Sequence, residues 1–152
     1  MLSFYQIILY SFEIKISIDF TNLREYFFQT VSNSSWAHES YLVGANIDWD
    51  DDEFYFEVTS LCSQFGIGLI ELNVEDPDLS RILIEAEKKN KFDLDNINKI
   101  LPINQNFKDY IQLVKQYSQA EHMNLIAEKP FDPIKEKTEL IESLQENGDQ
   151  VF

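Results

Sequence analysis

Cysteine, glycine and proline are scarce in this sequence, which has one cysteine, four glycines and four prolines among its 152 residues. A single cysteine excludes an intramolecular disulfide and suits a reducing cytoplasm. The low glycine and proline content excludes collagen-like and low-complexity sequence. The apolar stretch Met1–Phe12 is too short to span a bilayer before Glu13, and it lacks the basic start and the cleavage site of a signal peptide. We therefore expect a cytoplasmic protein without a membrane partner.

Basic side chains are also few. The chain has 12 lysines and arginines against 27 acidic residues, for a net charge of −15, and Lys15 and Arg24 are the only basic residues in residues 1–73. An acidic surface repels nucleic-acid phosphates, so this balance disfavours DNA as an autonomous partner. The same charge allows a less favoured hypothesis, an acidic protein that mimics DNA.

Hydrophobic residues are plentiful: they make up 44% of the chain and include 12 phenylalanines, enough for one domain with a substantial core. Their spacing predicts an order of strand, helix, strand, helix and strand, and helical connections of this length favour parallel strands in an α/β fold. The predicted elements are a strand within residues 3–18, a helix over 22–32, a strand over 39–46, a helix from about 50 to 65 and a strand over 67–72.

We expect three parts along the chain: a core of residues 1–73 that is incomplete at its N-terminus, a mostly helical extension of residues 74–127 packed on this core, and a mobile tail of residues 128–152. Residues 81–84 fit either a short strand or the start of a helix. Asn106 is expected to open a helix with one apolar face. The basic cluster Lys88, Lys89 and Lys91 is expected to be solvated surface.

Several residues have the chemistry of helix ends. Asn22 and Glu25, three residues apart, predict a capping box at the start of the first helix. Asp50 or Asp51 is expected to cap the second helix. Gly66 is expected to end the second helix, because glycine adopts the left-handed conformation found there.

Glu13 and Lys15 are the candidate functional residues of the first strand. Because successive side chains of a strand alternate between faces, both lie on one face, while Phe12, Ile14 and Ile16 lie on the other. A carboxylate favours a hard cation such as Mg²⁺, and a neighbouring ammonium can orient water near a phosphate. A structural ion pair on a buried strand is the alternative.

Residues 11–72 resemble the core of the PD-(D/E)XK nuclease superfamily, which has Glu-x-Lys on a central strand followed by a helix, a strand, a helix and a strand. A glutamine on the following helix is common there, and Gln29 is the candidate. The chain is also similar to HrgA-like bacterial proteins associated with restriction-modification loci. Stretches that carry this similarity are residues 10–15, 28–37, 65–70 and 93–103, with Asn106 and Phe107.

The resemblance implies a restriction-endonuclease-like fold, with a central mixed sheet flanked by helices and a small helical C-terminal part. It also implies Mg²⁺-dependent hydrolysis of DNA phosphodiesters. Glu13 and the backbone carbonyl of Ile14 would bind Mg²⁺, Lys15 would position the water or stabilise the phosphate, and Gln29 would orient the site.

One feature departs from the family pattern. The family has another acid on a strand before Glu-x-Lys, and this chain has no Asp or Glu before Glu13. One carboxylate and one carbonyl form a poor Mg²⁺ site. We therefore expect an incomplete domain with little or no cleavage. The alternative is a non-catalytic interaction module that joins a protein partner or a second copy through its sheet edge and aromatic patches.

Overall fold

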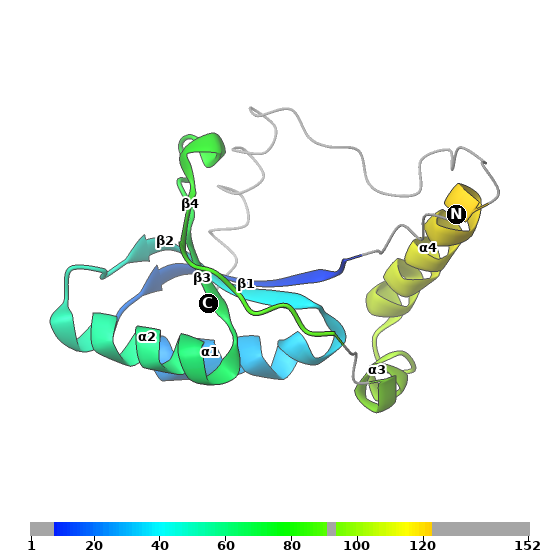
Figure 1. Cartoon of the computed structure of the whole chain (residues 1–152), viewed down its shortest axis with the longest axis horizontal. Helices are drawn as coiled ribbons and strands as arrows, with labels where there is room; N and C mark the ends of the chain where they lie inside the picture. Colours follow the sequence, from blue (N-terminus) through cyan, green and yellow to red (C-terminus); the bar gives the residue numbers. More distant parts are fainter. Residues whose placement is uncertain (1–7, 91–93, 123–152) are drawn as a thin grey trace. The chain divides into compact units, whose positions relative to one another are not determined.

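The computed structural model describes residues 8–90 and 94–122, and it divides into two units, residues 1–99 and 100–152. The first unit contains a mixed sheet with strands in the order β1-β2-β3-β4 (Figure 1). β1, β2 and β3 are parallel, and β4 is antiparallel to β3, so the predicted α/β class and parallel connections are confirmed. The strands are β1 (Tyr10–Ile18), β2 (Glu39–Ile47), β3 (Gly68–Glu71) and β4 (Arg81–Ile84).

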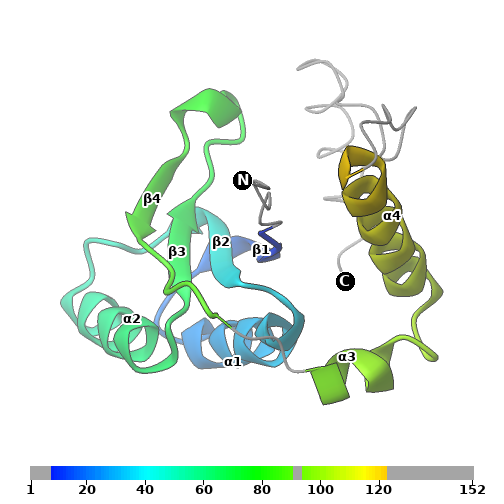
Figure 2. The same ribbon diagram turned by 45° about the vertical axis from the view of Figure 1, so that its right-hand side comes forward.

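Two helices, α1 (Leu23–Asn33) and α2 (Asp52–Phe65), lie on the same face of this sheet (Figure 2). The core lies between them and the strands. Cys62 is buried there, and burial raises the pKa of its thiol to about 12, which keeps it protonated and unreactive. The core residues with no exposed surface include Leu23 and Phe27 of α1, Phe54 and Val58 of α2, and Leu42 and Leu69 of the strands.

The ends of the two helices test the capping predictions. The Asp51 carboxylate accepts the N–H of Phe54 at 2.7 Å, and Gly66 follows α2 in the left-handed conformation with φ 68°, so both predictions are confirmed. The predicted capping box at Asn22 is wrong. Its side-chain oxygen accepts the N–H of Asp19 at 2.9 Å, because the tight turn after β1 directs this side chain back into the loop.

The sheet extends beyond residue 73, because residues 81–84 form a strand rather than a helix. The segment that follows returns to the start of the sheet. There the N–H of Lys89 donates to the carbonyl of His38 at 2.8 Å, and the Lys89 ammonium donates to the Ser34 hydroxyl at 3.0 Å. Lys89 is therefore a partly buried structural contact, not the solvated residue we predicted, and burial lowers the pKa of its ammonium.

Beyond the sheet, the structure describes α3 (Leu94–Ile100) and α4 (Gln105–His122). The Asn104 side chain accepts the N–H of Phe107 at 2.9 Å, so the cap lies two residues before the predicted Asn106. The predicted tail, residues 128–152, lies outside the described residues. None of the described helices combines the length and the apolar composition needed to cross a bilayer. The apolar face expected for this helix is half-buried and consists of Phe107, Tyr110, Ile111 and Val114.

Candidate functional site

The Glu13 and Lys15 side chains lie on the face of β1 that α1 covers, and each keeps 21% of its surface exposed. The apolar side chains lie on the opposite face, as the alternation predicts, but that face is the open one: Phe12, Ile14 and Ile16 are 54–60% exposed. The strand is also not central. Among residues 8–90, β1 pairs only with β2 and forms an edge of the sheet.

Lys15 is held by three neighbours. Its ammonium lies 2.9 Å from a Glu13 carboxylate oxygen and donates to the Gln29 side-chain oxygen at 2.7 Å. It also lies 4.5 Å from the centre of the Tyr26 ring, where the negative face of the aromatic system attracts a cation. The structure thus brings together the three side chains that the resemblance selects, from a strand and the helix that follows it.

A fourth polar residue, Asn33, completes this cluster and was not predicted. Its amide nitrogen donates to the second oxygen of Glu13 at 3.0 Å. Two strand residues span about 6.6 Å and four helical residues rise about 6 Å. A helix that runs antiparallel to β1 can therefore pair Gln29 with Lys15 and Asn33 with Glu13. That matched spacing is the sequence signal that would have identified Asn33.

The donor set at this cluster does not fit Mg²⁺. Glu13 is the carboxylate beside Lys15, and its two oxygens already accept hydrogen bonds from Lys15 and Asn33. A second carboxylate, Glu25, accepts the Gln29 amide N–H at 3.5 Å. Mg²⁺ requires near-octahedral oxygen coordination, which one carboxylate and the Ile14 carbonyl do not supply. Among the described residues, no group of three or more His, Cys, Asp or Glu side chains is arranged to hold a metal ion.

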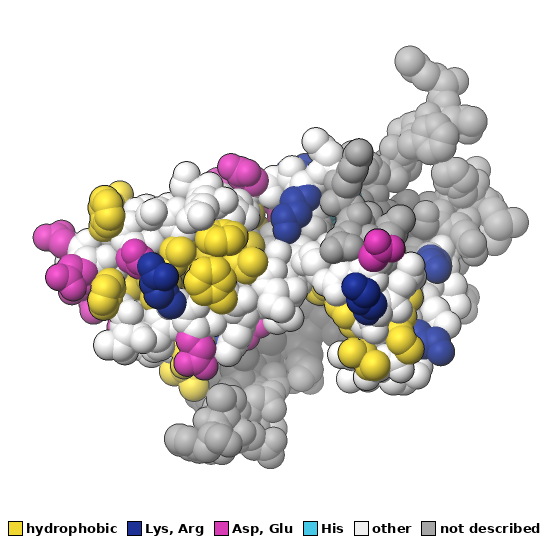
Figure 3. All heavy atoms as spheres, turned by 90° about the horizontal axis from the view of Figure 1, so that it is seen from below, with side chains coloured by type: hydrophobic (Ala, Val, Ile, Leu, Met, Phe, Trp, Pro, Cys, Tyr) yellow, Lys and Arg dark blue, Asp and Glu magenta, His cyan; other side chains and the backbone are white. Residues whose placement is uncertain are grey.

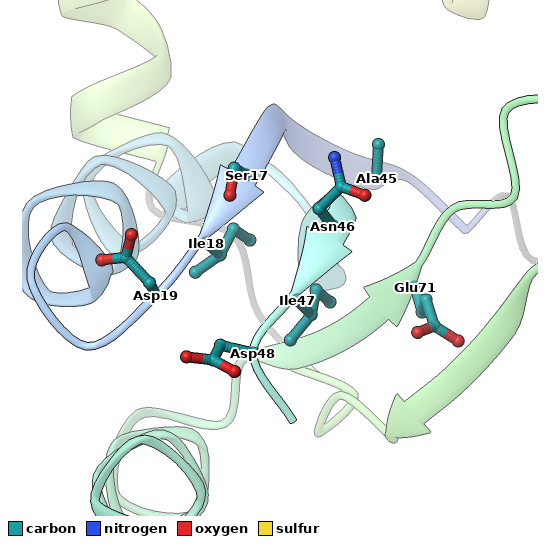
Figure 4. A pocket seen from close by; sticks show the side chains of 8 residues that line it. All are labelled: Ser17, Ile18, Asp19, Ala45, Asn46, Ile47, Asp48 and Glu71. Atoms are coloured by element: carbon teal, nitrogen blue, oxygen red, sulfur yellow. The ribbon is translucent and has the colours of Figure 1, made fainter. Parts of the chain in front are cut away.

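A separate hollow of about 440 Å³ lies at the C-terminal ends of β1, β2 and β3 (Figure 4). Its three carboxylates do not converge in Figure 4, and two of them have structural partners. Asp19 accepts hydrogen bonds from Thr21, which lower the pKa of its carboxyl group, and Glu71 pairs with Arg81 at 2.6 Å. The acids lining this hollow are Asp19, Asp48 and Glu71, and none of the predicted site residues lines it.

His38 connects the start of β2 to the residue before β1. Its ring nitrogen Nδ1 accepts the N–H of Leu9 at 2.9 Å, and the residue is only 6% exposed. Burial lowers the pKa of the imidazole, the nearby Lys88 lowers it further, and Glu39 opposes them. A proton on Nδ1 would remove the acceptor that Leu9 requires, so this contact needs neutral histidine.

We therefore expect the free energy of unfolding to fall as the pH is lowered from 7.5 to 5.5. Unfolded histidine takes up its proton near pH 6.5, whereas folded His38 does so only at lower pH. The unfolded state thus binds more protons in this window, and stability decreases with the pH. Urea unfolding at several pH values measures the slope.

His38→Ala provides the control for this prediction. The variant should be less stable at pH 7.5, because it leaves the buried N–H of Leu9 without its acceptor. Its stability should also change less between pH 7.5 and 5.5. Equal slopes in the two proteins would show that another group, such as His122, sets the pH dependence.

No protein-family model, curated protein or solved structure matches the chain.

Proposed function

We propose that this chain is a nuclease-like domain of the PD-(D/E)XK type that does not cleave DNA by itself. The observation that supports the proposal is the position of the Lys15 ammonium, between the Glu13 carboxylate at 2.9 Å and the Gln29 amide at 2.7 Å. The order strand, helix, strand, helix and strand around this cluster agrees with the resemblance. The finer fold assignment, a restriction-endonuclease-like core, belongs to this proposal.

We expect the chain to be inactive as a nuclease because, in the family it resembles, hydrolysis of a phosphodiester needs a metal site. The Glu13 oxygens already have partners, Glu25 accepts from the Gln29 amide, and the described residues contain no group of three or more acids, His or Cys placed to hold a metal ion. An ammonium that is paired with a carboxylate also has less charge to offer to a phosphate. The hydrogen bonds within the cluster stabilise it, but among the described residues no second acid lies beside Glu13 to bind a divalent cation.

The purified chain should therefore show no Mg²⁺-dependent nicking of supercoiled plasmid DNA above the level of Lys15→Ala. Isothermal titration should also give no saturable Mg²⁺ binding, because one carboxylate is insufficient. Gln29→Ala is a second control at the same cluster. Robust nicking that Lys15→Ala abolishes would contradict the proposed inactivity, and it would mean that the missing ligand comes from elsewhere in the chain.

The coding DNA directly upstream of the Met1 codon offers a second test. An in-frame continuation, or one restored by a single frameshift, that encodes a strand with an acid would supply the second carboxylate that the resemblance implies. The longer chain would then be the one to assay. Without such a continuation, the catalytic part of the resemblance would lose its support, and the domain would be treated as non-catalytic.

The second candidate function, a non-catalytic interaction module, is favoured by a different observation. The open face of β1 exposes three large apolar side chains in succession, Phe12, Ile14 and Ile16. Exposed apolar surface of this kind marks contact sites for other proteins. An interaction module does not need to contact DNA. The acidic charge of the chain and the partial burial of Lys15 are therefore compatible with this function.

A further inference from the structure

β1 has the properties of a strand that accepts a partner. It is nine residues long, and among residues 8–90 no strand pairs with its outer edge. An unpaired edge presents free N–H and C=O groups, and proteins usually protect such edges with charge, proline or a covering element. The open face of β1 has no charged residue and no proline. Its side chains Tyr10, Phe12, Ile14 and Ile16 are 41–60% exposed.

The apolar side chains of β1 continue as a row across the sheet. Ile14 pairs with Val43, Val43 with Ile70, and Ile70 with Ile82, so one aliphatic row crosses all four strands. The row is exposed at its ends, Ile14 and Ile82, whereas Val43 in the middle is only 5% exposed. Beside it, the Phe12 ring stacks on Tyr41 with centroids 6.0 Å apart. Neither α1 nor α2 lies on this face (Figure 2). The exposed apolar side chains therefore lie along β1 itself, at the free edge, where a further strand would cover them.

The sequence of β1 is complementary to itself when two copies run antiparallel about Ile14. In that register, Ile14 faces Ile14 of the second copy and Phe12 faces Ile16, so the open face stays apolar across the junction. On the other face, Glu13 lies opposite Lys15 of the second copy, and Lys15 opposite its Glu13. Ser11 and Ser17 also face each other, so no charge meets a like charge.

We propose that two copies of this chain associate through antiparallel pairing of their β1 strands, centred on Ile14, to form one continuous sheet. In a dimer with two-fold symmetry each favourable contact occurs twice, as in other isologous dimers. The charges of β1 support a second copy as the partner, because a neutral cluster of two glutamates and two lysines would form at the axis. This proposal does not rest on the nuclease-like function, so either can fail alone.

The overall charge opposes association, and the local pairing must overcome that repulsion. Each copy has a net charge of −15. At about 0.15 M salt the screening length is about 8 Å, so most of the repulsion between distant acids is removed while charges in direct contact still attract. Dimers should therefore weaken when the salt concentration is lowered well below this value.

The first test is sedimentation of the whole chain at about 0.15 M salt. We expect dimers at micromolar concentrations, and Ile14→Lys should raise the dissociation constant by at least about 100-fold, because two ammonium groups would meet at the axis. Phe56→Lys is the matched control. Phe56 is 75% exposed on α2, away from β1, and its replacement should leave the dimer unchanged.

Charge exchange tests the register. Glu13→Lys alone places a new ammonium group against Lys15 of the second copy, and Lys15→Glu alone places a new carboxylate against its Glu13, so each variant should be monomeric. A mixture of the two should form heterodimers, and the double variant should dimerise again. Circular dichroism verifies that the single variants remain folded, because both also lose the 2.9 Å pair within the protomer.

Two results would overturn the proposal. One is a monomeric chain at tens of micromolar, which would mean that the β1 edge stays open or is covered from within the same chain. The other is a dimer that survives Ile14→Lys or fails to re-form in the mixture of charge variants, which would place the interface elsewhere.

Discussion

Replacing Phe27 by alanine should lower the free energy of unfolding by about 3–5 kcal/mol, the range measured for large aromatic side chains removed from a core. Phe27 has no exposed surface and packs edge-to-face against Phe28 and Phe65, each with ring centroids 5.8 Å away. Its removal leaves a cavity where α1, α2 and the sheet meet. Denaturant unfolding followed by circular dichroism measures the loss.

The neighbouring Phe28 provides a matched control for this substitution. It has the same side chain, occupies the same helix and contacts the same Phe65 ring at 5.4 Å, but it is 41% exposed. Hydrophobic side chains are indeed visible at the surface on the helix side of the molecule (Figure 3). Phe28→Ala should therefore cost about 1 kcal/mol. Equal losses for the two variants would contradict the assignment of Phe27 to the core.

Gly68→Ala should be the second strongly destabilising substitution, with a loss of about 3 kcal/mol. A Cβ atom at Gly68 would lie 2.3 Å from two atoms of the Tyr41 ring and 2.8 Å from the backbone nitrogen of Ala86. The ring is buried and the backbone of residue 86 cannot rotate away. The strand β3 must therefore move from its place beside β2, which the unfolding midpoint will report.

Gly44→Ala is the matched control for this second substitution, because it also adds one methyl group to a neighbouring strand. There the close contacts, at 2.7 Å, are side-chain atoms of Ile18 and Ile47, which can adopt other rotamers. We expect a loss smaller than that of Gly68→Ala. A larger loss for Gly44→Ala would mean that side-chain crowding beneath α1 limits stability more than the backbone contact at Ala86.

Local chemistry explains which parts of this fold the sequence predicts. Asp51 and Gly66 define the ends of α2 because a short carboxylate before a helix and a glycine after it act within a few residues. The prediction of a capping box at Asn22 was wrong because the Asn22 side chain accepts the backbone N–H of Asp19 in the turn instead of an N–H of the helix. Alternation along β1 correctly separated Glu13 from Ile14, but it does not say which face the helices cover.

The candidate site was predictable only in part. Lys15 was selected with Glu13 from the chemistry of the first strand, and Gln29 was selected through a family resemblance; Lys15 and Gln29 meet in the structure at 2.7 Å. Asn33 contacts Glu13 across 20 positions of sequence, and Lys89 contacts Ser34 across 55. The matched spacing of β1 and α1 points to Asn33 only once the two elements are known to pack against each other. No comparable spacing points to Lys89, because its contact depends on where the segment after β4 returns. The position of β1 at the edge was missed for the same reason.

The return of residues 87–89 to the start of the sheet has a consequence for the order in which the chain folds. The backbone N–H of Glu87 donates to Gly66, that of Lys89 to His38, and that of His38 to Leu9, which joins four distant segments. Contacts between distant segments form slowly, because the intervening chain must first close into a loop. On a ribosome, the sheet therefore cannot be completed until β4 has emerged, and the contacts that join residues 87–89 to the start of the sheet form only after Lys89 has followed.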